Sequence, residues 1–267
     1  MLQQYLARPV AGFLLFLVTF AVTAQPSSLP AVPPPPVAAS SWLLIDLTSR
    51  QMLAEHNAGE RREPVSLTKL MTAYLAFSTL KQKQITLEQS VKISVRAWKA
   101  EGSRMFIEPN RPVTIDELLR GMIVQSGNDA SVAIAEAVAG SEEAFAQAMT
   151  REAQRLGMKN SNFVNATGLS HPQLYSTARD LAILAAAIIR DFPEYYPLYL
   201  IKEYKYNNIT QPNRNRLSIS NAKFLVVVLP GFSAKSAGTT SWSLSPATAG
   251  RHARHATPGA WWRPRRI

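Results

Sequence analysis

Ser66 and Lys69 stand three residues apart at the start of a long apolar segment with helical spacing. Residues three apart on a helix share a face, with Cβ atoms about 5–6 Å apart, so a hydroxyl lies beside an amine. A serine becomes a nucleophile when a base takes its proton. A lysine can be that base when burial and nearby cations lower its pKa. The alternative is a helix-capping serine followed by a solvated lysine.

A second polar pair, Ser126 and Asn128, flanks Gly127 at a break between two expected helices. Glycine tolerates backbone angles that other residues avoid, so we expect Gly127 to turn the chain and expose the hydroxyl beside the amide. Alone, this segment is more typical of an ordinary interhelical turn. However, S-x-x-K followed by S-x-N about 60 residues later occurs, together with K-T-G, in penicillin-binding proteins and β-lactamases.

The chain resembles the serine-type D-alanyl-D-alanine carboxypeptidases, which are low-molecular-mass penicillin-binding proteins. The resemblance covers about residues 40–217 without an obvious gap. It rests on six segments: E-P-V-S-L-T-K-L-M-T-A-Y (63–74), E-G-S-R-M-F (101–106), V-T-I-D-E-L-L-R-G-M-I-V-Q-S-G-N-D-A-S (113–131), N-F-V-N-A-T-G-L (162–169), T-A-R-D-L-A (177–182) and Y-N-N-I-T-Q-P-N-R-N-R-L (206–217).

The resemblance implies an α+β transpeptidase fold of the penicillin-binding-protein and β-lactamase type, with an antiparallel sheet and a helical lobe. It also implies a reaction, removal of the terminal D-alanine from peptidoglycan pentapeptide stems. Ser66 would attack the penultimate D-alanine carbonyl and Lys69 would be the base. Ser126 would relay a proton to the leaving amine, and Asn128 would hold the substrate backbone. A penicillin would acylate Ser66 as a substrate mimic, and no metal or organic cofactor is implied.

The third family element, K-T-G on a strand, is replaced here by K-S-A-G-T-T at residues 235–240. This segment is one residue too long, and one extra strand residue turns the next side chain to the opposite face, unless a bulge absorbs it. Lys235 and Thr239 are therefore candidate carboxylate-binding residues. A serine β-lactamase is the alternative within this chemistry. No segment matches the glutamate loop of the class A enzymes, and N-A-T-G-L favours the carboxypeptidase.

The elements that must position these residues follow from caps and apolar periodicity. Strands are expected at both ends of the domain and helices between them. This pattern predicts an α+β fold, with a sheet built from distant chain ends and a helical insertion. We expect a hairpin at 42–47 and 51–56, helices at 66–80, 114–124, 128–139, 141–157 and 177–190, a mixed region at 81–113, a polar loop at 158–176, and strands at 204–210 and 222–229.

The N-terminal 24 residues have the pattern of an export signal. Arg8 precedes a short apolar run, residues 10–22, and Val22-Thr23-Ala24 supplies small residues for cleavage. The run is short for a membrane span, and an uncleaved anchor is the alternative. A Pro-rich linker, 25–40, follows. We place a catalytic domain at 41–244 and a basic, disordered tail at 245–267. Export to the periplasm, including the outer face of the inner membrane, is expected.

Composition excludes several other classes of protein. The chain has no cysteine and four histidines without an HExxH pair, which excludes thiol catalysis, disulfides and zincin-type metal sites. The net charge of +11 suggests nucleic-acid binding. Seven of these positive charges lie in residues 218–267, which carry no acid, so most of the excess belongs to the C-terminal end of the chain and not to a shaped basic face.

The region after residue 217 departs from the family. No second β-rich domain or C-terminal membrane anchor is recognisable, and the Arg-rich end resembles translation out of frame. A second hypothesis is therefore a truncated or out-of-frame product that is inactive or only binds peptidoglycan stems. It predicts that the strands pairing beside residues 42–47 are missing, that the sheet is incomplete, that part of the helix after Ser66 is uncovered, and that stability is marginal.

Overall fold

The computed structural model describes residues 39–47, 49–214, 224–229 and 243–245. All of them belong to one unit, Pro35–Ile267. Several of the sequence predictions lie outside the described residues: the export signal 1–24, the linker up to residue 38, Lys235 and Thr239, and the tail from residue 246 onward. The last described strand ends at Ser245, one residue inside the segment that we assigned to the tail.

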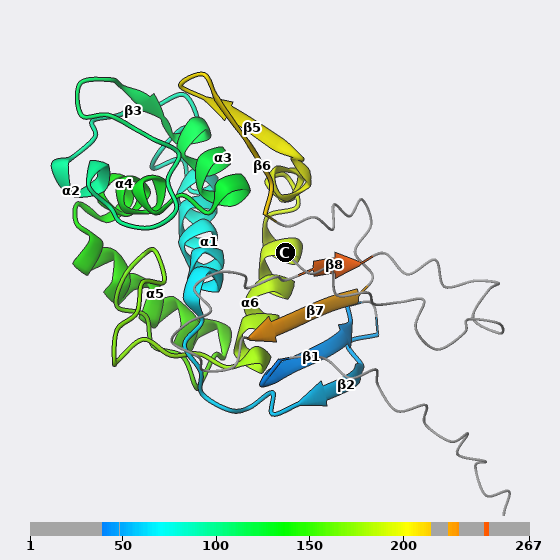
Figure 1. Ribbon diagram of the computed structural model, residues 1–267. Helices are drawn as coiled ribbons and strands as arrows, with labels where there is room; N and C mark the ends of the chain where they lie inside the picture. The colour runs from blue at the N-terminus through cyan, green and yellow to red at the C-terminus, as the bar shows by residue number, and fades with distance from the viewer. Residues whose placement is uncertain (1–38, 48, 215–223, 230–242, 246–267) are drawn as a thin grey trace, which may run out of the picture. The chain divides into compact units, whose positions relative to one another are not determined.

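Helix α1 (Thr68–Lys81) is the central element of the helical lobe (Figure 1). It contacts four other helices, α3 (Ile115–Gln125), α4 (Asn128–Ala139), α5 (Glu142–Leu156) and α6 (Ala178–Asp191). Phe77, Met71 and Ala73 on α1 are completely buried, and so are residues on its other faces. A helix that is apolar all round belongs in a core. The expectation that part of this helix would be uncovered is wrong.

The helix boundaries follow from capping residues that are visible in the sequence. Thr114 and Glu117 form a reciprocal capping box at α3, as predicted. Ser141 caps α5 and Thr177 caps α6, each accepting a backbone N–H with its hydroxyl. None of the helices in the described part of the chain is both long and apolar enough to cross a bilayer.

The main sheet is antiparallel, with strand order β2-β1-β7-β8. The predicted hairpin, β1 (Ser41–Asp46) and β2 (Met52–His56), forms its first half. β7 (Phe224–Leu229) pairs with β1 along its whole length, and β8 (Ser243–Ser245) pairs with β7. The prediction that β1 lacks a partner is therefore wrong, because a segment rich in β-branched residues forms that partner strand.

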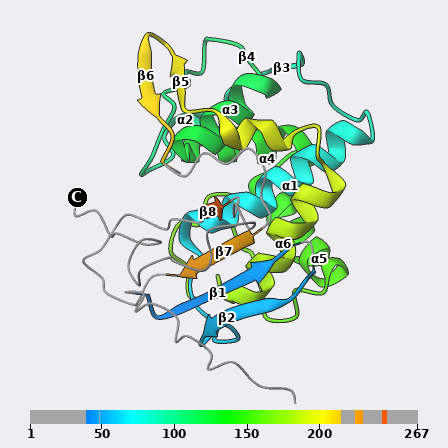
Figure 2. The same ribbon diagram turned by 90° about the vertical axis from the view of Figure 1, so that its right-hand side faces the viewer.

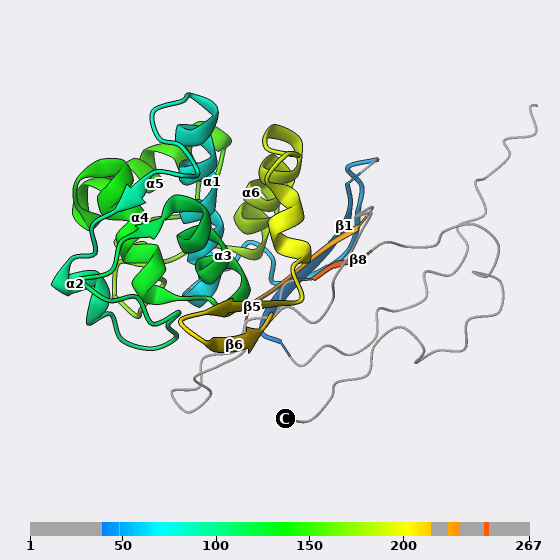
Figure 3. The same ribbon diagram turned by 90° about the horizontal axis from the view of Figure 1, so that it is seen from above.

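Helix α6 joins the sheet to the rest of the core. It contacts β1 and β7 on one side and α1 on the other. Figure 3 shows α6 between α1 and the sheet, and Figure 2 shows the strands in the order β8, β7, β1 and β2 from top to bottom. Helix α6 therefore lies between the sheet and the helix that carries Lys69.

Two small antiparallel pairs lie at the edge of the helical lobe. β3 (Ser90–Val91) pairs with β4 (Val113–Thr114) around the short helix α2 (Val95–Trp98). The single strand predicted at 204–210 is instead a hairpin, β5 (Glu203–Tyr206) and β6 (Ile209–Pro212), that follows the 3-10 helix η2 (Tyr196–Leu200). Asn207 and Asn208 both have positive φ, as a two-residue hairpin turn requires.

Proline at Val226 tests the place of β7 in the sheet. Val226 pairs with Leu44 of β1 on one side and with Ser243 of β8 on the other. Val226→Pro removes a ladder hydrogen bond, and a lost buried bond costs about 1–3 kcal/mol. Thermal unfolding should therefore shift downward by about 2–4 °C for each kcal/mol.

Leu53→Pro is the matched control, because Leu53 is the unpaired extra residue where the register of the edge strand β2 shifts. We expect this variant to melt close to the wild type. An unchanged melting temperature for Val226→Pro would show that β7 is not part of the folded sheet.

Candidate active site

Ser66 lies in η1 (Val65–Leu67), a 3-10 turn that leads directly into α1. Val65 has a φ of 49°, which is strained for a β-branched residue. Gly168 lies against the backbone of Val65, since a Cβ on Gly168 would come within 1.8 Å of the Val65 oxygen. The chain just before Ser66 is thus held in an unusual conformation by a close backbone contact. Among the described residues, the Ser66 hydroxyl has no hydrogen-bond partner.

Lys69 is buried, with 7% of its surface exposed. Its Nζ donates to the carbonyl oxygen of Thr167 at 2.6 Å. The pKa of Lys69 is lowered from its usual 10.5 to about 7, mainly by burial and also by the positive charge of Arg214, while the negative charge of Asp129 opposes the shift. At neutral pH a substantial fraction of the amine is therefore neutral and able to accept a proton.

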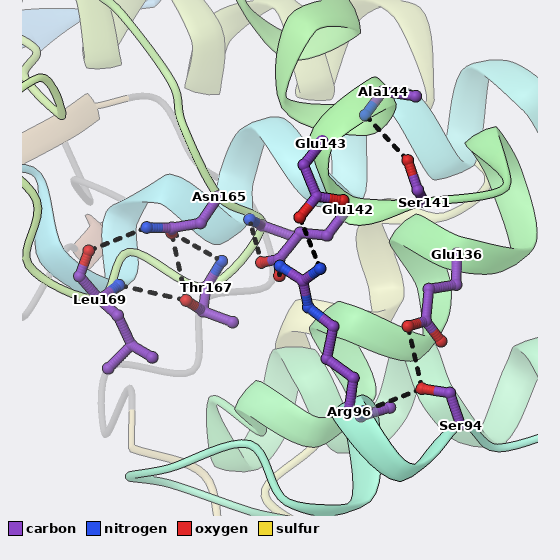
Figure 4. Close-up of polar contacts among 12 residues, drawn as sticks. Ser94, Arg96, Glu136, Ser141, Glu142, Glu143, Ala144, Asn165, Thr167 and Leu169 are labelled. Carbon is purple, nitrogen blue, oxygen red and sulfur yellow. Dashed lines mark hydrogen bonds and ion pairs between the residues drawn. The ribbon is translucent and has the colours of Figure 1, made fainter.

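The loop 165–169 that carries Thr167 is held by side-chain hydrogen bonds (Figure 4). Asn165 Oδ1 accepts from the backbone N–H groups of Thr167 and Gly168, and its Nδ2 donates to the Leu169 carbonyl. Thr72 of α1 donates to the Ala166 carbonyl at 2.8 Å. These bonds close the loop on itself and fasten it to the first turns of α1.

Ser126 ends α3 in the left-handed conformation, with a φ of 59°. Its Oγ is buried and has no hydrogen-bond partner in the described part of the protein. We predicted the unusual backbone angle at Gly127, and this is wrong, since Gly127 has a φ of −62°. Gly127 is needed for space instead, because a Cβ there would lie 2.9 Å from Asp129 Oδ1.

Asn128 is buried at the start of α4 and is fixed by segment 101–103. Its Nδ2 donates to the Glu101 carbonyl, and its backbone N–H donates to the Ser103 carbonyl, both at 2.6 Å. The side-chain oxygen of Asn128 receives no hydrogen bond from any described residue. It is therefore the group that remains to accept a hydrogen bond from a ligand.

Sequence reasoning missed two charged residues at this site, Asp129 and Arg214. The Asp129 carboxylate is completely buried and accepts the backbone N–H groups of residues 105, 106 and 107. Arg214 donates to the Ser103 hydroxyl at 2.6 Å, and its N–H donates to the Val124 carbonyl. Both residues lie in segments that carried the family resemblance, but their charge effect on Lys69 depends on tertiary contacts.

The structure thus brings four of the six predicted site residues into one region. Ser66 lies in the turn η1 just before α1, and Lys69 lies in the first turn of α1. Ser126 and Asn128 lie close to Asp129, whose charge acts on Lys69. No hydrogen bond joins Ser66 to Lys69, whose amine is engaged by Thr167 instead. Lys235 and Thr239 lie outside the described residues. No cluster of metal-ligating side chains occurs in the part of the chain that the structure covers.

Comparison with known families gives a match over most of the chain. Residues 28–240 match the family described as D-alanyl-D-alanine carboxypeptidase, Peptidase S11. This match extends beyond the resemblance noted above, which ended near residue 217. It includes the segment that contains Lys235 and Thr239.

Individual relatives are similar in sequence and in structure. D-alanyl-D-alanine carboxypeptidase DacC of Escherichia coli (strain K12) is 43% identical over 224 residues, 81% of this chain and 56% of that protein. The crystal structure of penicillin binding protein 5 from Haemophilus influenzae is 43% identical, with a TM-score of 0.68 over 70% of this chain and 55% of that one. Penicillin binding protein 6B from Escherichia coli is 36% identical, with a TM-score of 0.67 over 75% of this chain and 70% of that one. The chain spans about half the length of the curated relatives it matches.

Replacing Lys69 by methionine tests the buried amine through stability. The unfolded chain keeps the lysine proton up to about pH 10.5, whereas the native state releases it near pH 7. Between these values the unfolded state binds more protons, so the unfolding free energy of the wild type rises with pH. The slope reaches about 1.4 kcal/mol per pH unit. The stability of Lys69→Met relative to the wild type should therefore fall between pH 7 and pH 10, as measured by urea unfolding. A difference that does not vary with pH would contradict the lowered pKa.

Gly168→Ala tests the contact that holds Val65. Gly168 and Gly140 have nearly the same positive φ, 83° and 79°, so alanine pays a similar backbone cost of about 1 kcal/mol at either position. A Cβ at Gly140 meets nothing, whereas at Gly168 it collides with the Val65 carbonyl. Gly168→Ala should therefore melt several degrees below Gly140→Ala in a thermal scan. Equal melting temperatures would show that Gly168 does not lie in close contact with the Val65 backbone.

Proposed function

Because this chain belongs to the D-alanyl-D-alanine carboxypeptidase family, we propose that it is an exported serine carboxypeptidase that removes the terminal D-alanine from peptidoglycan pentapeptide stems. The observation that supports this most directly is the Lys69 amine, which is buried and has a pKa of about 7. It lies one helical turn after the Ser66 hydroxyl, which has no hydrogen-bond partner among the described residues. A general base works best when its pKa lies near the working pH. No metal or organic cofactor is needed in this proposal.

Acylation begins at Ser66. The neutral Lys69 amine takes the Ser66 proton as Oγ attacks the carbonyl carbon of the penultimate D-alanine. The bond between Thr167 and Lys69 directs the amine while leaving its lone pair for this proton. The result is a tetrahedral oxyanion beside the start of α1, where the helix dipole favours negative charge.

Ser126 and Asn128 serve the leaving group and the substrate backbone. The carbon–nitrogen bond breaks, and Ser126 relays a proton to the departing D-alanine amine. The Ser126 hydroxyl suits this role because it is buried and no residue that the structure describes hydrogen-bonds to it. The side-chain oxygen of Asn128 accepts an N–H of the substrate. Water then hydrolyses the Ser66 ester, which releases the shortened stem and restores the serine hydroxyl.

The remaining parts of the proposal rest on sequence. Lys235 and Thr239 would bind the terminal carboxylate of the substrate. Residues 1–24 would direct export to the periplasm. A penicillin would form the same ester with Ser66, because its strained amide imitates the scissile bond. The two alternatives are a serine β-lactamase, which would release the drug rapidly, and a chain that binds stems without forming any ester.

Fluorescent penicillin labelling of the purified full chain tests the proposal. Ser66→Ala should abolish covalent labelling and leave circular dichroism unchanged. Lys69→Ala should slow acylation by about 10²–10⁴-fold, the usual cost of losing a general base. Lys81→Ala is the control, since Lys81 lies at the exposed C-terminal end of the same helix, and it should label like the wild type. A folded wild type that takes up no label would leave only the non-catalytic alternative, and rapid loss of the label would favour the β-lactamase.

A further inference from the structure

Glu142, in the first turn of α5, is a buried carboxylate whose two oxygens bond to two distant segments. The residue is 6% exposed. Its Oε1 accepts the backbone N–H of Ala166 at 3.0 Å, and its Oε2 accepts from Arg96 Nη2 at 2.7 Å. Figure 4 shows Glu142 between the guanidinium of Arg96 and the loop that contains Asn165 and Thr167. Glu142 therefore links α2, α5 and the loop 165–169.

The backbone of this loop leads from Glu142 to both proposed reactive groups. Ala166 precedes Thr167, whose carbonyl accepts the Lys69 amine, and Gly168 follows it in contact with the Val65 backbone, next to Ser66. Both backbone polar groups of Ala166 are hydrogen-bonded: its N–H donates to Glu142, and its carbonyl accepts from Thr72. A shift of the Ala166 backbone would move the neighbouring Thr167 carbonyl away from the Lys69 amine.

A simpler role for Glu142 is stabilisation of the helix N-terminus, where acidic side chains are favourable. Glu143 occupies the same turn and already serves that purpose with its side chain 65% exposed. Burying a second carboxylate is costly unless it is paired and hydrogen-bonded. Glu142 meets both conditions only because Arg96 and Ala166 are placed to satisfy it. The buried position of Glu142 is therefore better explained by its bonds to Arg96 and to the Ala166 N–H than by the helix dipole.

We propose that Glu142, paired with Arg96, is a positioning residue that acts through the Ala166 N–H to hold the Thr167 carbonyl on the Lys69 amine. The proposal rests on the function proposed above for Ser66 and Lys69. Glu142 does not touch the reacting atoms. It keeps the loop closed over Lys69, and so keeps water away from the amine that serves as the base.

The expected effect on Lys69 has a definite sign. Burial is the largest cause of the lowered pKa of Lys69, and the other charges facing the amine are Arg214 and Asp129. Loosening the loop admits water, which favours the ammonium and raises the pKa. Losing the Thr167 bond acts in the opposite direction, since that bond favours the ammonium. We expect the admission of water to outweigh it, because burial is the largest cause of the lowered pKa. Without Glu142, the midpoint of the Lys69 titration should therefore move upward.

Three variants of the full chain separate positioning from folding. Glu142→Met keeps the side-chain length and removes the acceptor, and Glu142→Gln keeps an uncharged acceptor. Glu143→Met is the matched control, because Glu143 also bonds Arg96 but does not contact the loop. The Lys69 titration is followed by ¹³Cε NMR of labelled lysine, with its resonance assigned by its absence in Lys69→Met. Penicillin acylation rates are measured on the same samples across pH 5–10.

We expect Glu142→Met to raise the Lys69 midpoint by about one pH unit or more, and to slow acylation at pH 7 by about fivefold or more through the smaller neutral fraction. Glu142→Gln should shift the midpoint in the same direction by less, and Glu143→Met should match the wild type. Equal midpoints in Glu142→Met and Glu143→Met would overturn the proposal, even if acylation slowed. If Glu142→Met does not fold, a Glu142→Gln midpoint identical to that of Glu143→Met overturns it.

The two proposals fail in different ways. A wild-type chain that takes up no penicillin removes the proposed function. The NMR titration still measures whether Glu142 controls the environment of Lys69, because it needs no turnover. Normal acylation with no shift in any Glu142 variant removes the positioning role alone.

Discussion

The burial of one amine constrains much of this structure. An ammonium group placed away from water is costly unless a partner satisfies it or its proton leaves. Both apply to Lys69: the Thr167 carbonyl accepts its hydrogen bond, and its pKa is lowered to about 7, so the proton can leave near neutral pH. Keeping that environment requires α1 to be surrounded by helices. It also requires a loop from another part of the chain to lie over the first turn of α1.

This requirement explains why the structure around Lys69 contains several costly local features. Val65 adopts a strained φ, Gly168 touches its backbone, and Glu142 is a buried charge. Strained backbone persists where the surrounding structure over-determines it, and such positions cluster at functional sites. Each of these features is adjacent to Ser66 or to the loop that bonds Lys69. The elements farther from Lys69, such as the capped ends of α3 and α6, use ordinary local chemistry.

The structural features that can be predicted from this sequence are those determined by residues close together in the chain. The caps at Thr114, Ser141 and Thr177 identify helix starts correctly because each cap acts within three residues. The partners of Lys69 could not be found in this way, because Thr167 is distant in sequence and contributes only a backbone carbonyl, which any residue carries. The β5–β6 turn was missed although Asn207 and Asn208 suit it. The α+β pattern predicts a sheet built from distant chain ends, and the pairing of β7 with β1 confirms it. The contrary expectation, that the partner strands of β1 are missing, extends the departure from the family motif around residue 235 to a segment whose β-branched residues favour a strand.

The main sheet joins the beginning and the end of the described chain, and this affects the order of folding. Trp42 of β1 pairs with Val228 of β7, so all the helices that the structure describes lie within the loop that this pairing closes. Closing a long loop costs entropy before the strand contacts compensate for it, and non-local pairings form slowly for that reason. We therefore expect the helices to associate first and β7 to dock last, and pulsed hydrogen exchange would show this as later protection of β1 and β7 amides. Until that step, the hairpin of β1 and β2 presents an unpaired edge, on which another unfolded chain can pair and aggregate.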